Sequence, residues 1–351
     1  MDGLRGLAIL LVVTGHLFSK YYIFNLGWTG LNLFFLLSGY LITNRLFFHI
    51  SSETLDYFKN FYARRILRIF PLYYGCLITL FVALPLIYNK YQQYFSSLYN
   101  IQEWYWFYIS NWRIILYGLP SNNLFFHFWS LAVEEQFYLI WPLIFFFVSA
   151  YHKRILTIFI ILILSFFFRA FFSESPVVYY NTLTAAEPLL LGCLVSILEK
   201  KNKLISFYRS AGILAVLSVI SLCLILLFNA DPHITNHTLL GLGYLNIDLI
   251  WTFLLIIILT RPRKMVFVDK TFSSGLFVWL GIYSYGIYIF HWIILQLFIN
   301  KYDILLTQNG FSELYSYWLT RTLGIVITLL ASFLSYHLYE QKFLSLKKYF
   351  I

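Results

Sequence analysis

Long apolar runs, separated by short polar segments, follow one another along almost the whole chain. A helix that crosses a bilayer core of about 30 Å takes about 20 mostly apolar residues, and most of these runs approach or exceed that length. Cutting the runs at charged and turn-rich breaks predicts ten helices, over Leu4–Phe18, Trp28–Phe48, Ile69–Tyr88, Leu124–Tyr151, Ile155–Phe172, Leu183–Leu198, Ala211–Phe228, Leu239–Thr260, Gly275–Ile299 and Leu314–Leu338. The pattern therefore predicts an all-α integral membrane protein with about ten transmembrane helices, forming one domain over residues 1–351.

Composition strengthens the membrane prediction. Hydrophobic residues make up 60% of the chain and charged residues only 11%, far from the average of soluble proteins. The first apolar run resembles a signal-peptide core, but no small-residue cleavage site follows it and it contains Arg5 and His16, so we expect a transmembrane helix there. The three cysteines all fall in apolar runs and are expected to be core residues, not a disulfide or metal set: Cys76, Cys193 and Cys223.

The basic residues predict how the chain is oriented. If the N-terminus is cytoplasmic, 19 of the 25 lysines and arginines fall on the cytoplasmic side and 6 on the other. This positive-inside bias predicts that both termini are cytoplasmic, and it accounts for the net charge of +10 without a nucleic-acid partner. The aromatic-rich stretch Tyr94–Pro120 is predicted to be interfacial or re-entrant, because a further span there would place the basic segment Lys200–Lys203 outside.

Two ionisable residues stand inside the first apolar run. Arg5 and His16 are eleven residues apart, which places them on one face of a helix and about 16 Å apart along its axis. Ionisable groups within a membrane helix are costly and usually functional. Because histidine exchanges a proton near neutral pH, His16 is a candidate general base or group carrier.

Five short segments together resemble one family. They are, in chain order, Asp2-Gly-Leu-Arg5 with His16 beyond it, Gly27-Trp-Thr-Gly-Leu-Asn-Leu-Phe-Phe-Leu-Leu-Ser38-Gly39, Tyr62-Ala-Arg64-Arg65-Ile-Leu-Arg68-Ile-Phe-Pro71, His127-Phe-Trp129-Ser130-Leu-Ala-Val-Glu134-Glu135-Gln136-Phe-Tyr138, and Gly281-Ile-Tyr-Ser284-Tyr285-Gly-Ile-Tyr288-Ile-Phe-His291. Their order and content resemble the acyltransferase family 3 membrane proteins over essentially the whole chain.

The resemblance implies a multi-pass enzyme of the bacterial inner membrane. It implies transfer of an acyl group, commonly acetyl, from cytoplasmic acyl-coenzyme A to a hydroxyl of an envelope polysaccharide or a lipid-linked sugar. Membrane lipid, the donor and the glycan acceptor are then the expected partners. The family usually has a longer N-terminal lead and an arginine near the sixth helix, in an Arg-x-Asp/Glu arrangement. Here Ala185-Ala186-Glu187 carries only the acid, so no role is assigned to Glu187.

Acyl transfer to an alcohol needs a base and charge stabilisation. His16 is the predicted base or transient acyl carrier. The alternative is a structural histidine that is hydrogen-bonded inside the bundle to a backbone or hydroxyl partner. Glu134 and Glu135 are predicted to orient His16 or to stabilise an imidazolium, with at least one facing the bundle interior; an acid near a helix N-terminus is the alternative. His127 and Tyr138 are supporting candidates.

A donor such as acyl-coenzyme A also needs a grip on its phosphates. Arg65 and Arg68 are three residues apart and share a helix face, so they and Arg5 are the predicted phosphate ligands, against the alternative of a topogenic basic cluster. Three residues of the predicted ninth helix, which we call the late group, are expected to serve either in helix packing or in an acceptor site: Ser284, Tyr285 and His291. No metal is predicted, including at the loop that holds Asp231, His233 and His237.

Two other functions fit buried charges in a membrane bundle. One is a transporter or flippase for an envelope lipid or glycan, and the other is a non-catalytic membrane subunit of polysaccharide assembly. The combination of inner basic residues, a mid-membrane histidine and acidic partners favours the enzyme.

Overall fold

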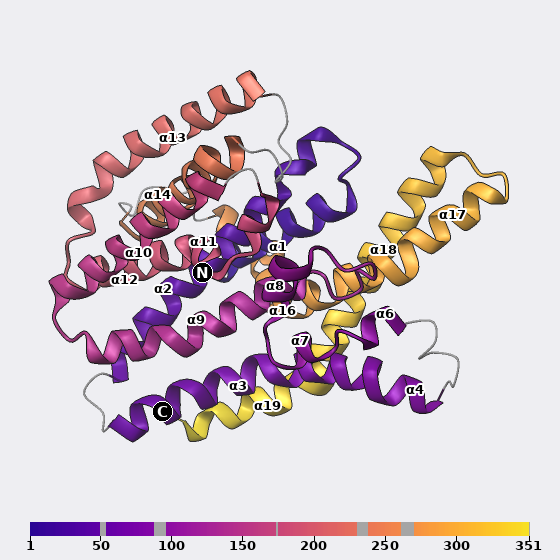
Figure 1. Ribbon diagram of the computed structural model, residues 1–351, viewed down its shortest axis with the longest axis horizontal. Coiled ribbons are helices and arrows are strands. Elements are labelled where there is room, and N and C mark those ends of the chain that lie inside the picture. Colours follow the sequence, from indigo (N-terminus) through magenta and orange to yellow (C-terminus); the bar gives the residue numbers. More distant parts are fainter. Residues whose placement is uncertain (50–53, 88–95, 173–174, 230–237, 261–269, 351) are drawn as a thin grey trace. The chain divides into compact units, whose positions relative to one another are not determined.

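The chain folds into helices and connecting segments (Figure 1). The computed structural model describes residues 1–49, 54–87, 96–172, 175–229, 238–260 and 270–350, and every regular element in these ranges is helical. The residues group into two compact units, one of Met1–Ser52 with Val133–Ile282 and the other of Glu53–Ala132 with Tyr283–Ile351. Helices α9 and α16 each pass from one unit into the other, so neither unit is a continuous stretch of chain, and the single domain over residues 1–351 stays a prediction.

Unit 1 contains the N-terminal helices and the middle of the chain. Its elements are α1 (Asp2–Leu17), η1 (Tyr22–Trp28), α2 (Thr29–His49), most of α9 (Phe128–Phe147), α10 (Tyr151–Phe172), η3 (Pro176–Tyr180), α11 (Thr182–Ala185), α12 (Glu187–Lys200), η4 (Ile205–Phe207), α13 (Tyr208–Asn229), η5 (Leu239–Gly243), α14 (Tyr244–Thr260) and the first part of α16 (Gly275–Ile294). Helices α10, α12, α14 and α13 lie side by side in this unit (Figure 1).

Unit 2 begins with a long helix and ends with another. Its elements are α3 (Thr54–Ile78) with η2 (Thr79–Ala83) and α4 (Leu84–Ile87), α6 (Ser96–Tyr99), α7 (Glu103–Trp106), α8 (Ser110–Tyr117), the rest of α16 with η6 (Leu295–Ile299) and α17 (Asn300–Gln308), and α18 (Glu313–Ser335) with η7 (Tyr336–Glu340), α19 (Gln341–Ser345) and η8 (Leu346–Tyr349). The hairpin of α17 and α18 is closed by an ion pair in which Arg321 Nη1 lies 2.6 Å from Asp303 Oδ2.

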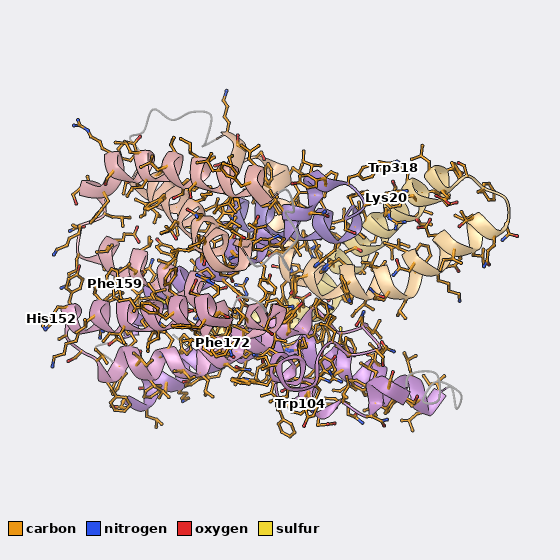
Figure 2. The ribbon with its side chains drawn as sticks, turned by 45° about the horizontal axis from the view of Figure 1, so that its top comes forward. Lys20, Trp104, His152, Phe159, Phe172 and Trp318 are labelled. Carbon is orange, nitrogen blue, oxygen red and sulfur yellow. The ribbon has the colours of Figure 1, made fainter. Side chains whose placement is uncertain are left out.

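Nine helices of the described ranges are long and apolar enough to cross a membrane, which confirms a multi-pass architecture. The remaining predicted span, the first along the chain, is α1, whose 16 residues extend about 24 Å. Many apolar side chains of α10 face outward, as expected for helices solvated by lipid; Phe159 and Phe172 are 47% and 53% exposed (Figure 2). The side of the membrane on which the termini lie stays a prediction.

Several predicted helix ends differ from the observed ones. The third helix was expected from Ile69 but begins at Thr54, and the ninth continues beyond Ile299 to Gln308. Both extensions are polar helical segments. An apolar run marks the part of a helix that lipid surrounds, whereas backbone hydrogen bonding continues past that limit.

The aromatic-rich stretch before α9 does not form a span. Between Ser96 and Tyr117 it forms three helices of 4, 4 and 8 residues, too short to cross a bilayer. Side chains of α3 hold it in place, because the Tyr73 hydroxyl donates to the Tyr105 carbonyl at 2.8 Å and the Tyr74 hydroxyl to the Trp106 carbonyl at 3.0 Å. Within unit 2, the described part of this stretch therefore packs against α3 and contains no full span, as predicted, whereas its interfacial or re-entrant position stays a prediction.

Glycines bring α2 and α12 into backbone contact. A Cβ placed on Gly39 would lie 1.9 Å from the Leu189 carbonyl oxygen, and one on Gly192 would lie 2.0 Å from that of Leu36. Small residues allow such close approach between membrane helices. We call this contact the α2–α12 glycine seam; it fixes the position of α2, which carries Asn32 and Ser38.

Candidate functional site

Helix α1 carries both ionisable residues predicted for the first run. Arg5 and His16 lie in one uninterrupted helix, as predicted, and both are half-buried. The Arg5 guanidinium lies 3.3 Å from the Asp2 carboxylate one turn earlier, an ion pair that is partly open to solvent. His16 occupies the last turn of α1. The predicted separation of about 16 Å along the axis therefore holds.

The glycines of the second segment position the end of α1. A Cβ on Gly15, next to His16, would lie 2.8 Å from the Cα of Gly27, and one on Gly30 would lie 2.5 Å from the Ala8 carbonyl oxygen. The backbone of α1 is thus in direct contact with η1 next to His16, and with the start of α2 at Ala8, two turns earlier. Side chains at these positions would displace His16.

Helix α9 brings one of the two predicted glutamates into unit 1. Glu134 accepts a hydrogen bond from the Ser38 hydroxyl at 2.8 Å, so it faces α2 and not lipid. It is the seventh residue of α9, which removes the alternative of a charge in the first turn. The neighbouring Glu135 is half-buried and Tyr138 is 3% exposed. The expectation that at least one acid faces the bundle interior is confirmed for Glu134, whereas an interaction with His16 stays a prediction.

The arginines of α3 have different roles: Arg64 has a structural contact, whereas Arg65 and Arg68 stay candidate phosphate ligands. Arg64 donates to the Phe350 carbonyl at 2.6 Å and so fastens the C-terminal segment to α3. Arg65 lies 6.0 Å from the Phe61 ring centroid, and Arg68 interacts electrostatically with Glu340. The pair was expected just before the third span but lies inside α3, on one continuous helix, so the shared face of Arg65 and Arg68 is preserved.

Unit 2 gathers two histidines with two hydroxyls. The rings of His127 and His291 have centroids 5.5 Å apart, and both residues are buried. The Tyr288 hydroxyl donates to the His127 carbonyl at 2.9 Å and lies 2.5 Å from the Ser130 hydroxyl. His291 Nδ1 lies 2.7 Å from the Tyr288 carbonyl oxygen. We call these four residues the unit 2 histidine cluster.

The sequence had suggested His127 and His291 separately, without their contact and without Ser130 and Tyr288. A signal was present in the spacing, since Ser130 follows His127 by three residues and His291 follows Tyr288 by three. Of the two other residues in the late group, Ser284 is buried, and the Tyr285 hydroxyl donates to the Ile69 carbonyl at 2.6 Å, which makes Tyr285 a link between α16 and α3.

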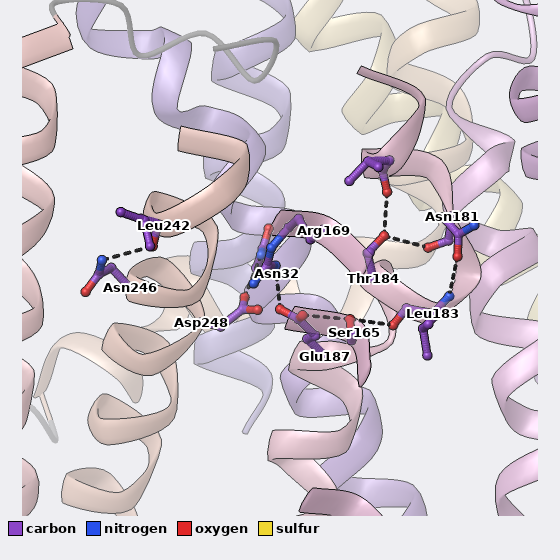
Figure 3. Close-up of polar contacts among 11 residues, drawn as sticks. Asn32, Ser165, Arg169, Asn181, Leu183, Thr184, Glu187, Leu242, Asn246 and Asp248 are labelled. Atoms are coloured by element: carbon purple, nitrogen blue, oxygen red, sulfur yellow. Dashed lines mark hydrogen bonds and ion pairs between the residues drawn. The ribbon is translucent and has the colours of Figure 1, made fainter. Parts of the chain in front are cut away.

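A second polar group in unit 1 was missed. Arg169 Nη1 lies 2.5 Å from Glu187 Oε2, and the Ser165 hydroxyl donates to Glu187 Oε1 at 2.6 Å (Figure 3). Beside them Asn32 Nδ2 donates to Asp248 Oδ1 at 2.6 Å. We call these five residues the buried polar cluster. The acid that seemed to lack an arginine thus pairs with one from α10.

No metal site emerges from the part of the chain that the structure describes: no three His, Cys, Asp or Glu side chains come together there. The loop residues Asp231, His233 and His237 lie outside the described residues. The cysteines Cys76, Cys193 and Cys223 are free thiols.

Comparison with known proteins gives one family and several relatives. A family model described as an acyltransferase domain matches residues 1–337. The peptidoglycan O-acetyltransferase OatA of Listeria monocytogenes is 32% identical over 85% of this chain and 49% of its own length. The putative peptidoglycan O-acetyltransferase YrhL of Bacillus subtilis is 28% identical over 97% of this chain and 54% of its own. A putative O-acetyltransferase of Staphylococcus aureus is 29% identical over 98% and 56%. The chain spans about half the length of these relatives, and no solved structure matches it.

Proposed function

The chain belongs to the acyltransferase domain family, and from that premise we propose that it is a multi-pass membrane O-acyltransferase that acetylates a hydroxyl of a cell-wall or envelope glycan. The donor in this proposal is acetyl-coenzyme A on the cytoplasmic side of the bacterial inner membrane. The observation that carries the proposal is the co-linear family match, which includes the relatives named O-acetyltransferases.

The chain offers residues for each step that the reaction needs. The acceptor O–H bond breaks and a C–O bond forms to the acetyl carbon, while the C–S bond breaks and the proton ends on the coenzyme A sulfur. His16 is the proposed base, or the carrier that holds the acetyl group between donor and acceptor. Glu134, held by Ser38, is the proposed acid that stabilises a cationic imidazole, with Glu135 as the second candidate.

Donor binding is assigned to the basic face of α3. Arg65 and Arg68 are proposed to hold the phosphates, because guanidinium groups bind phosphate oxygens bidentately. Arg5, on α1, is a separate candidate phosphate ligand. Substitution tests this assignment. Arg65→Lys and Arg68→Lys should each raise the KM for acetyl-coenzyme A, and alanine should raise it further, because lysine keeps the charge but loses the fork. Arg64→Lys is the matched control, since the Arg64 guanidinium binds the Phe350 carbonyl.

Two measurements decide between the enzyme and the other functions. Purified protein should transfer radiolabelled acetyl from acetyl-coenzyme A to a peptidoglycan fragment or another envelope saccharide. Mass spectrometry should find fewer O-acetyl groups on the envelope glycans of a deletion strain. Unchanged glycans, together with no saturable coenzyme A binding, would refute the enzyme and favour a transporter or a non-catalytic subunit.

A further inference from the structure

The buried polar cluster of unit 1 holds more acids than bases. Its side chains include one guanidinium, Arg169, and two carboxyls, Glu187 and Asp248, which are 1%, 1% and 0% exposed. If both acids were ionised, the cluster would carry one uncompensated negative charge inside an apolar helix bundle. Such a charge is strongly unfavourable, so charge balance calls for one bound proton.

The two acids have unequal partners. Glu187 accepts from Arg169 and from Ser165, and it is the first residue of α12, where the helix dipole favours a negative charge. Among the described residues, the Asp248 carboxyl accepts only from Asn32, through Oδ1, and its Oδ2 has no hydrogen-bond partner. Glu187 is therefore the ionised acid and Asp248 the acid that holds the proton.

Arg169 retains donors for a second partner. Its Nε and Nη2 are buried without a hydrogen-bond partner among the described residues, while its guanidinium lies 4.7 Å from the centroid of the Tyr244 ring. Arg169 and Glu187 both act electrostatically on Asp248, one turn beyond Tyr244 on α14. Figure 3 shows Arg169 beside Asn32, next to the Asp248 carboxyl.

The other elements around Asp248 add little charge. Tyr179 of η3 couples electrostatically to Tyr244, and Asn32 is the polar contact from α2. Helix α13 packs along α14, and its one acidic or basic residue is Arg209, in its first turn. The charge state of the cluster is thus decided by Arg169 and the two acids.

We propose that the buried polar cluster is a proton-binding site in which Asp248 holds one proton while Arg169 pairs with Glu187. When Arg169 turns to Asp248, the O–H bond on Asp248 breaks and an O–H bond forms on Glu187, so the cluster stays neutral in both states. The cluster lies at the end of α10 and α12 opposite to Lys153 and Lys200. Under the proposed function, the acceptor hydroxyl loses its proton on the side of the membrane where the cluster lies. Only this connection between the cluster and acetyl transfer rests on the proposed function.

Infrared spectroscopy of the purified full chain, without donor or acceptor, tests the site. A protonated carboxyl gives a C=O stretching band that shifts in deuterated water and is absent from an ionised carboxylate. We expect Asp248→Asn to remove one such band. Glu187→Gln should also remove it, because Asp248 then ionises to pair with Arg169. Arg169→Gln should add a second band, because no cation remains for Glu187.

Asp303→Asn is the matched control, since Asp303 lies 2.6 Å from the Arg321 guanidinium, outside the buried polar cluster, and its loss should leave the band intact. An unchanged band in Asp248→Asn would overturn the proposal. If that variant does not fold, the unsubstituted chain can be made with aspartate labelled with carbon-13 at the side-chain carboxyl carbon. The label should shift the band, and an unshifted band would equally overturn the proposal. Protein that shows the band but transfers no acetyl group would refute the proposed function and leave the proton site standing.

Discussion

The α2–α12 glycine seam gives a sharp steric prediction. In Gly39→Ala the new Cβ would lie 1.9 Å from the Leu189 carbonyl oxygen, whereas real Cβ atoms stay at least 3.0 Å from such atoms, so the helices must separate locally by 1.1 Å. Gly192→Ala meets the Leu36 carbonyl oxygen at 2.0 Å from the other side. Because both obstacles are backbone atoms inside helices, no side chain can turn away to make room.

The magnitude follows from overpacking. Extra atoms in a well-packed core cost about 1–3 kcal/mol, and alanine in a helix recovers up to about 1 kcal/mol relative to glycine. Gly212→Ala, on α13 with no atom within 4 Å of the new Cβ, makes the same change of helix propensity without the clash. The difference in unfolding free energy between Gly39→Ala and Gly212→Ala therefore isolates the clash and should be about 1–3 kcal/mol.

The assay is unfolding in detergent micelles followed by circular dichroism, with acetyl transfer measured in parallel. Gly39 follows Ser38, the donor to Glu134, so Gly39→Ala should also reduce kcat. The reasoning is refuted if Gly39→Ala and Gly192→Ala both unfold within about 0.5 kcal/mol of Gly212→Ala, the range of ordinary surface substitutions.

Three further predictions concern catalysis, the buried ion pair and topology. His16→Ala should abolish acetyl transfer at normal protein level, because the proposed base or carrier is lost; substantial residual activity would move the chemistry elsewhere. Arg169→Met should destabilise the protein by about 3–5 kcal/mol, because both acids lose their cation, whereas Glu187→Met should cost less, because Asp248 then ionises to pair with Arg169. The double variant should recover most of the Arg169→Met loss, as thermal unfolding of all three variants would test. A membrane-impermeant thiol reagent should label Lys201→Cys only from the cytoplasm and Lys301→Cys only from outside. Labelling of position 201 from outside would contradict the predicted topology.

The membrane character and most of the helices could be predicted from the sequence. In lipid every backbone polar group must be satisfied within the chain, so long apolar runs have to be helices, whatever surrounds them. The joint location of Arg5 and His16 on one helix was predictable for the same reason, because helical geometry is local. The start of α3 and the continuation of α16 through η6 into α17 were not predictable, since polarity marks the limit of the lipid contact and not the limit of the helix.

The polar pairs depended on tertiary packing. Asn32 and Asp248 are 216 residues apart, and the pair of Arg169 with Glu187 joins two separate helices. Hydropathy assigns such residues to a helix but not to a partner, because which side chains meet depends on how neighbouring helices are rotated and on how closely glycines let them approach. For the same reason His127 and His291 could be suspected one by one, whereas their contact required the packing of α16 beside the start of α9.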